Sequence, residues 1–150
     1  MNTESGNESA CCNKFEKFLC KDLGLLILRL AVGGLMLPHG IAKLIKGLDG
    51  MKGMLASKGL PEIMAYGVYL GEIVAPILII IGFATRPAAL LLAFTMLMAI
   101  SLAHSSEIFT LGQTGGLAIE LPFFYLLASL ALFFTGSGKI ALGGGRKPLD

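Results

Sequence analysis

The chain has 150 residues, of which 55% are hydrophobic and 15% are charged, and its formal net charge is +2. Soluble domains average about 25% charged residues, so this composition excludes an ordinary soluble domain. The small net charge gives no basic surface of the kind that binds nucleic acid, and the mean hydropathy of +0.77 predicts a chain that lies mostly within a membrane.

Residues 1–21 precede the first apolar segment. Residues 1–13 are small and polar, too poor in apolar surface to offset the entropy of ordering, so we predict a mobile tail. Residues 14–21 alternate charges with apolar side chains, which is typical of an interfacial lead-in at a membrane. For the three cysteines of this region, reduced thiols without a role, acylation and metal capture all stay open: Cys11, Cys12 and Cys20.

Four apolar segments are long enough to cross a hydrocarbon core of about 30 Å, which takes about 20 helical residues. They cover residues 22–45, 64–83, 85–104 and 117–136. The first is longer than the apolar core of a cleaved signal peptide and contains Arg29. We therefore predict an all-α fold, an integral membrane four-helix bundle with kinked helices in a domain of residues 22–141, followed by a C-terminal tail of residues 142–150.

The connections carry weaker signals. After the first span, apolar residues at helical spacing are interrupted by glycines, so a short interfacial helix and a flexible loop both stay open. The sequence "GFATRPAAL" predicts a tight hairpin between the second and third spans, because Pro87 suits a first helical turn. The "GSGK" motif after the fourth span lacks the spacing of a phosphate loop, which excludes that reading.

The distribution of lysine and arginine predicts the orientation. With four spans both termini lie on one side, and that side carries seven basic residues against four on the other. The positive-inside rule then predicts cytoplasmic N and C termini in a bacterial cytoplasmic (inner) membrane.

Ionisable residues inside the apolar segments are the strongest functional signal, because a charge near mid-membrane is costly. At 100° per residue, Arg29, His39 and Lys43 fall within an arc of about 80° on the first helix. Gly33 and Gly40 lie on or near that face, which suits close approach of another helix.

Counting 1.5 Å of rise per residue gives the depth of each group. Arg29 lies about 9 Å from the inner boundary and Glu72 about 12 Å below the outer one. The same count places four further groups in the outer half: His39, Lys43, His104 and Glu120. We predict a polar pocket there, with Glu72 as its hub. Arg29, within combined side-chain reach of Glu72, is a further candidate ligand-binding residue.

Two prolines support this choice. Pro76 has no N–H for the carbonyl of Glu72, and Pro38 has none for the carbonyl of Gly34. Kinked helices with freed carbonyls beside ionisable groups favour an internal polar cavity.

Two other interpretations stay open. In the structural one, Arg29 pairs with Glu72 as helix-packing glue and the outer groups sit at the interface. In the other, a metal binds the two histidines and two glutamates, but no pair has ligand spacing within one helix, so we predict no metal site.

The ordered set "LILRLAVG", "PHGIAKL", "KGLPE", "GEIVAPILIIIGFATRPAALLLA", "MAISLAH" and the terminal "GSGK" resembles the DoxX family of small four-helix bacterial membrane proteins. The resemblance implies that polar residues are kept at Arg29, His39, Lys43, Glu72, Arg86 and His104. The family takes its name from a subunit of a complex that passes electrons from thiosulfate to quinone, and other members resemble partners of redox or oxidative-stress proteins.

The sequence and the resemblance together give three functional hypotheses. The first is a membrane subunit that supports quinone- or thiol-linked redox reactions, with a quinone or another small polar molecule in the outer pocket and no covalently bound cofactor. The second is a non-catalytic scaffold or anchor that forms a homo-oligomer or engages redox partner subunits. The third is a small-molecule transporter, for which four spans are few.

Overall fold

The computed structural model describes the backbone of residues 5–103 and 115–143, and the side chains of residues 21–102 and 115–143. Its elements are α1 (Ser5–Lys46), α2 (Asp49–Ser57), η1 (Glu62–Tyr66), α3 (Gly67–Tyr69), η2 (Leu70–Val74), α4 (Ala75–Ile81), α5 (Thr85–Ala103) and α6 (Glu120–Thr135).

The predicted membrane fold is confirmed. Within the described part of the chain, three helical stretches are long and apolar enough to cross a membrane, Lys21–Lys46, Glu62–Ile81 and Thr85–Leu102. The fourth predicted span contains α6, an apolar helix of 16 residues. At 1.5 Å per residue α6 is about 24 Å long, so it alone falls somewhat short of the hydrocarbon thickness.

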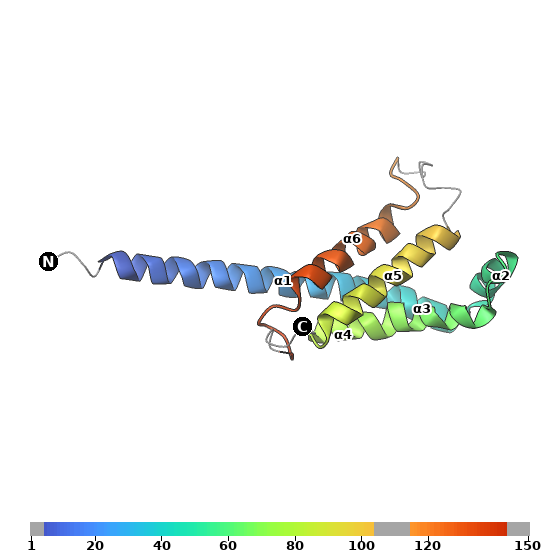
Figure 1. Ribbon diagram of the computed structural model, residues 1–150, viewed down its shortest axis with the longest axis horizontal. Coiled ribbons are helices and arrows are strands. Elements are labelled where there is room, and N and C mark those ends of the chain that lie inside the picture. Colours follow the sequence, from blue (N-terminus) through green and yellow to red (C-terminus); the bar gives the residue numbers. More distant parts are fainter. Residues whose placement is uncertain (1–4, 104–114, 144–150) are drawn as a thin grey trace.

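Helix α1 is longer than the first predicted span. It begins at Ser5, within the stretch for which the sequence predicts a tail, and its N-terminal half projects alone from the bundle (Figure 1). Good helix formers such as lysine and glutamate occupy this stretch, and no proline interrupts it. The helix also continues through Pro38, which is exposed on the surface of the bundle.

The second span is divided into four pieces, η1, α3, η2 and α4. In η2, a single π-helical turn, the N–H of Ala75 bonds the carbonyl of Leu70 five residues earlier. Pro76 follows directly and has no N–H to continue the ladder, which agrees with a distorted helix at this point. The turn places Glu72 near the middle of the break.

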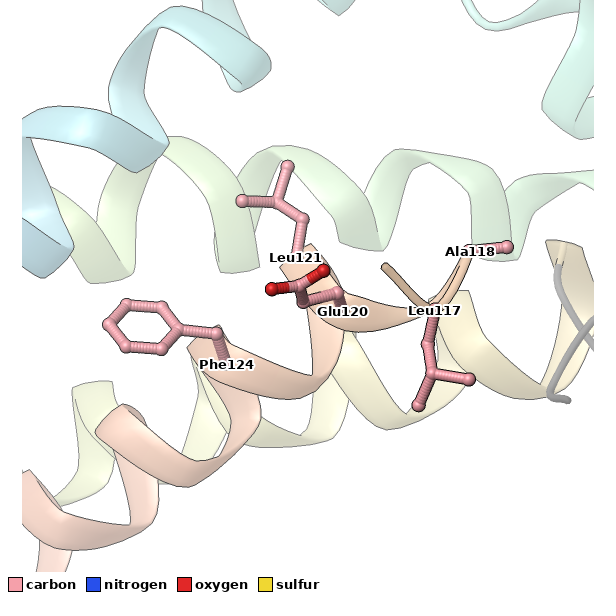
Figure 2. Close-up of a pocket in the computed structure, with 5 residues that line it drawn as sticks. All are labelled: Leu117, Ala118, Glu120, Leu121 and Phe124. Carbon is pink, nitrogen blue, oxygen red and sulfur yellow. The ribbon is translucent and has the colours of Figure 1, made fainter. Parts of the chain in front are cut away.

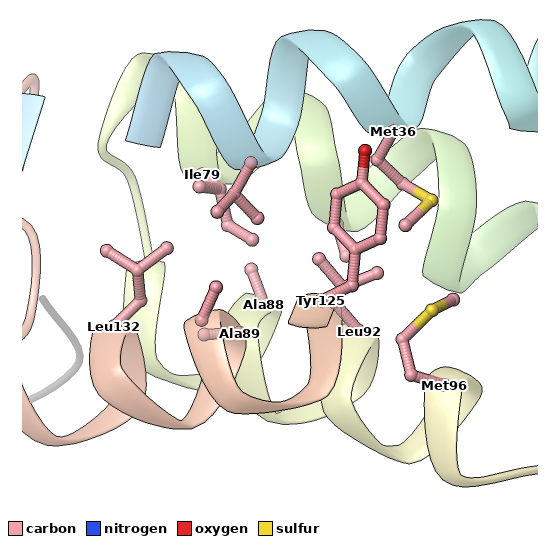
Figure 3. Close-up of a cluster of buried hydrophobic side chains, with 11 residues drawn as sticks. Met36, Ile79, Ala88, Ala89, Leu92, Met96, Tyr125 and Leu132 are labelled. Carbon is pink, nitrogen blue, oxygen red and sulfur yellow. The ribbon is translucent and has the colours of Figure 1, made fainter. Parts of the chain in front are cut away.

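The hydrophobic core lies where α1, α4, α5 and α6 meet (Figure 3). Small residues allow the close packing that the sequence predicts. A Cβ added to Gly33 would lie 2.8 Å from the carbonyl oxygen of Pro76, and one added to Gly40 would lie 2.6 Å from that of Glu72. The glycine face of α1 therefore packs directly against the backbone of the second span.

The connection after α1 forms a short helix, and the connection after α4 forms a tight hairpin. The stretch after α1 forms the short helix α2, whose Leu55 is buried with Leu48 and Ala65 in a second apolar cluster. The predicted tight hairpin is confirmed, since α4 ends at Ile81 and α5 begins at Thr85. Gly82 closes α4 with a φ of 71° in the left-handed region, where glycine is favoured.

Candidate functional site

A cavity of about 190 Å³ lies between α1, η2, α5 and α6. We call it the central pocket. It brings together three of the residues predicted from the sequence, His39 and Lys43 from α1 and Glu72 from η2. Its other lining residues are Met36, Met96, Ala99, Leu121, Pro122 and Tyr125.

Glu72 is deeply buried at the central pocket, with only 3% of its surface exposed. Its Oε1 atom accepts a hydrogen bond from Lys43 Nζ at 2.5 Å, which makes an ion pair. Its Oε2 atom is also buried, but it has no hydrogen-bond partner within the described part of the chain. One carboxylate oxygen is thus neutralised, and the other is left to accept a bond.

The backbone around Glu72 explains how a carboxylate reaches this position. The π turn displaces the residue from a regular helical register, and π turns are frequent at functional sites. Gly40 packs against the carbonyl of Glu72, which Pro76 deprives of its helical partner. The glycine therefore lets α1 approach closely enough for Lys43, one turn further on, to reach the carboxylate.

Tyr125 is a pocket residue that sequence reasoning missed. It comes from α6 and is 3% exposed, and in Figure 3 its hydroxyl points toward α1 beside Met36. Its ring meets that of His39 edge to face, with 6.4 Å between the centroids and 77° between the planes. The available signal was a single tyrosine within the apolar sequence of the fourth segment.

Glu120 lies in a neighbouring cavity of about 390 Å³ at the start of α6 (Figure 2). Leu121 lines both cavities, so the two adjoin. The other residues of this second cavity are Leu117, Ala118 and Phe124. His104, which the sequence assigns to the same outer region, lies outside the described residues.

Arg29 belongs to a different place in the fold. Its guanidinium donates hydrogen bonds to the carbonyls of Ile79 at 3.0 Å and Ile80 at 3.2 Å, in the last turn of α4. It also donates to two carbonyls after α6, those of Ser137 at 2.5 Å and Ile140 at 2.8 Å. Arg29 thus ties the ends of α4 and α6 together instead of pairing with Glu72, and we call these four bonds the Arg29 clamp.

Other polar groups gather near the helix ends tied by the Arg29 clamp. Asp22 Oδ1 accepts a hydrogen bond from the backbone N–H of Lys139 at 3.1 Å. Thr85 Oγ1 and Arg86 Nε are buried without a hydrogen-bond partner among the residues described. Asp22 and Arg29 therefore hold the segment after α6, which includes the "GSGK" sequence, against the bundle.

Metal binding receives no geometric support from the described residues, in which no three His, Cys, Asp or Glu side chains come together as possible ligands. The set considered from the sequence is divided. His39 and Glu72 share the central pocket, whereas Glu120 lies in the neighbouring cavity.

The profile of the DoxX family matches residues 24–105, which include α2, the divided second span and all of α5. The chain belongs to the DoxX family. The matched stretch carries His39, Lys43 and Glu72, so the ionisable part of the central pocket lies within the DoxX region.

Three proteins with sequences similar to this DoxX chain cover most of its length. "Putative oxidoreductase CatD" from Bacillus subtilis (strain 168) is 33% identical over 81% of this chain and 85% of its own length. "Inner membrane protein YphA" from Escherichia coli (strain K12) is 34% identical, over 79% and 86% respectively. An "Uncharacterized protein" from Haemophilus influenzae (strain ATCC 51907 / DSM 11121 / KW20 / Rd) is 34% identical, over 87% and 94%. No solved structure is significantly similar to the chain.

Proposed function

We propose that this DoxX protein is a membrane subunit that supports redox reactions, and that its central pocket binds the headgroup of a quinone or a similar small ring. The observation that carries the proposal is Glu72, a buried acidic residue, 3% exposed, which lines a cavity together with Lys43, His39 and Tyr125. A buried ionisable group within a membrane protein is a functional-site hypothesis by default, since burying it without a use is costly.

The lining chemistry suits a quinone headgroup. Each quinone carbonyl needs a hydrogen-bond donor, which the Lys43 ammonium, the Tyr125 hydroxyl and an imidazole N–H of His39 can supply. Glu72 can accept a proton when a bound ring exchanges protons during reduction or oxidation. Met36, Met96 and Leu121 provide apolar contacts for the ring faces.

The size of the pocket also suits one ring. A cavity of about 150 Å³ in another protein holds benzene, and the central pocket has about 190 Å³. The neighbouring cavity, of about 390 Å³, adjoins it at Leu121. An isoprenoid tail attached to the ring would leave through this mostly apolar opening or into lipid.

The names of the relatives give independent support for this assignment. One relative is named as an oxidoreductase and another as an inner membrane protein. We assign this chain to a bacterial cytoplasmic membrane, with both termini in the cytoplasm by the positive-inside rule. The central pocket then opens in the half of the bundle that faces away from the cytoplasm.

A binding titration tests the proposal. The protein in lipid nanodiscs is titrated with a short-chain benzoquinone by calorimetry, a suitable readout because the chain has no tryptophan for fluorescence. Ala99→Phe places a ring in the central pocket and should abolish binding. Ala131→Phe makes the same change at an exposed site of α6 and should leave binding intact. Equal binding by both variants, or no binding by the unchanged protein, would reject the proposal.

The second candidate function is a scaffold or anchor without a ligand. The N-terminal half of α1, which projects alone from the bundle (Figure 1), favours it, because an unaccompanied helix is available to a partner subunit or a second copy. Removal of residues 1–20 should then release co-purifying partners, whereas Ala99→Phe should not. Partners retained after the deletion would argue against the scaffold.

A further inference from the structure

We infer that Tyr125 determines the specificity of the central pocket, because its hydroxyl forms the hydrogen bond that selects a ring with an oxygen atom on its edge. The inference rests on the proposed function and names the group that recognises the ligand. It follows from the partners that each polar side chain of the pocket already has.

Two of the polar side chains that line the central pocket are paired with each other. Lys43 Nζ donates a hydrogen bond to Glu72 Oε1 at 2.5 Å, and the two charges form an ion pair. The second oxygen of this carboxylate, Oε2, is sealed from solvent. Recognition of an uncharged ligand therefore falls mainly to the two other polar side chains of the lining, those of His39 and Tyr125.

Tyr125 is buried, yet its hydroxyl has no partner. Only 3% of the residue is exposed, and the hydroxyl makes no hydrogen bond with any residue in the described ranges 21–102 and 115–143. Unlike Oε2 of Glu72, the hydroxyl is not one of the sealed atoms, so it is open to the pocket that Tyr125 lines. In Figure 3 it points toward α1 beside Met36. A ligand that bonds to this hydroxyl relieves the cost of a buried polar group without a partner.

His39 holds the ring of Tyr125 from the side of α1. The two rings meet edge to face, with 6.4 Å between their centroids and 77° between their planes, and such a contact favours one ring orientation. His39 itself is exposed, so its imidazole finds partners outside the protein whether or not a ligand is bound. Among the described lining residues, the buried and unpaired hydrogen-bonding group is thus the Tyr125 hydroxyl.

The rest of the lining does not distinguish one ring from another by hydrogen bonding. It has no side-chain donor and contacts any ring of suitable size by dispersion. These residues are Met36, Met96, Ala99, Leu121 and Pro122. A ring without oxygen would fit among them but would leave the Tyr125 hydroxyl unpaired, and a site that bonds a polar group discriminates against analogues that lack it.

The contact depends on the oxygen atom of the ligand and not on its redox state. A phenol hydroxyl both donates and accepts hydrogen bonds. Tyr125 can therefore donate to the carbonyl of a quinone and can accept from the hydroxyl of a hydroquinone. The ligand class that the pocket selects is a ring with an oxygen substituent, in either form.

A pair of ligands combined with one substitution tests the inference. The dissociation constants of a short-chain benzoquinone and of an alkylbenzene with the same chain are measured by calorimetry in nanodiscs. The unchanged protein should bind the quinone about tenfold more tightly, or better. Tyr125→Phe removes only the hydroxyl, so it should weaken quinone binding by about tenfold and change alkylbenzene binding by less than about threefold.

Tyr66 provides the matched control. It lies in η1, is 51% exposed and does not line the central pocket. Tyr66→Phe removes a hydroxyl in the same way and should leave the affinities for both ligands unchanged.

A spectroscopic measurement tests the same contact with Tyr125 in place. The chain has three tyrosines, so a Tyr66→Phe, Tyr69→Phe variant retains Tyr125 alone. With ring-labelled tyrosine, the infrared band of the phenol C–O stretch should shift when the quinone binds and should not shift with the alkylbenzene. This measurement decides the question if Tyr125→Phe fails to fold.

The outcomes separate the inference from the proposed function. Quinone affinity unchanged in Tyr125→Phe, an equal loss for both ligands, or a bound quinone without a band shift would overturn the role of Tyr125 and leave a quinone pocket in place. Absence of quinone binding by the unchanged protein would instead reject the proposed function itself.

Discussion

Substituting Gly40 by alanine should destabilise the protein, although the same change usually stabilises a helix. A Cβ at this position would lie 2.6 Å from the carbonyl oxygen of Glu72 and 2.6 Å from Cγ1 of Ile73. The oxygen belongs to the backbone and cannot turn aside as a flexible side chain would. Ordinary van der Waals contact begins at 3.4 Å, so α1 and the second span must separate by about 0.8 Å.

The expected magnitude is the difference of two opposing effects. Replacing glycine by alanine within a helix gains about 0.5–1 kcal/mol from lower backbone entropy. Overpacking a tight contact costs about 1–3 kcal/mol. Because this contact is against backbone, we expect the cost to prevail and the free energy of unfolding to fall by about 1–2 kcal/mol.

Gly34 provides a matched control on the same helix. A Cβ added there meets no atom within 4 Å, so Gly34→Ala should change stability by between zero and about 1 kcal/mol in the stabilising direction. Both variants are compared in bicelles by following helix content with circular dichroism during unfolding. The reasoning is refuted if the two shift stability in the same direction, or if Gly40→Ala is the more stable.

Three further perturbations address other parts of the fold. Arg29→Lys keeps the charge but cannot maintain four hydrogen bonds to two separate segments, so we expect the free energy of unfolding to fall by about 2–4 kcal/mol. Trypsin should also cleave faster after Lys139, which mass spectrometry measures. Leu55→Ala empties a site that is 2% exposed and should cost about 2–3 kcal/mol in unfolding free energy. The hydrogen bond to the Tyr66 hydroxyl raises the pKa of Lys52 above its ordinary 10.5. The charged Lys52 therefore stabilises the folded protein at neutral pH, and this stabilisation is lost as the pH rises past the raised pKa. The thermal midpoints of wild type and Lys52→Met should accordingly converge at high pH.

Each of these expectations has a contradicting result. Unchanged cleavage after Lys139 in Arg29→Lys would mean that the Arg29 clamp does not hold the C-terminal segment. An unfolding free energy of Leu55→Ala equal to that of wild type would mean that α2 adds nothing to stability. A difference in thermal midpoint between Lys52→Met and wild type that grows with rising pH would mean that folding does not raise the pKa of Lys52.

The architecture could be predicted from the sequence because the membrane imposes it. Hydrocarbon thickness fixes the length of each span, and helical geometry fixes which residues share a face. The same geometry correctly indicated that Gly33 and Gly40 line a close helix contact. It also indicated a pocket containing His39, Lys43 and Glu72, which the structure brings together.

The partners of the charges were harder to predict. Arg29 and Lys43 share a face, but 14 residues of helix separate them by about 21 Å, and only Lys43 reaches Glu72. Arg29 binds backbone carbonyls, which every residue has, so no side chain in the sequence marks its partners. Tyr125 was missed for a related reason, since its position depends on how α6 rotates against α1.

The Arg29 clamp also bears on the order in which the protein is made. The first two hydrogen bonds join Arg29 to Ile79 and Ile80, which follow it by 50 and 51 positions in the sequence. The second two join it to Ser137 and Ile140, which follow it by 108 and 111 positions. The second group can form only after α6 and the segment that follows it have been synthesised and inserted. Until then half of the guanidinium's acceptors are missing, and water or lipid phosphates must take their place. Docking of Ser137 to Ile140 is therefore a late step of biogenesis, and chains that end before this segment should be retained by quality control or degraded.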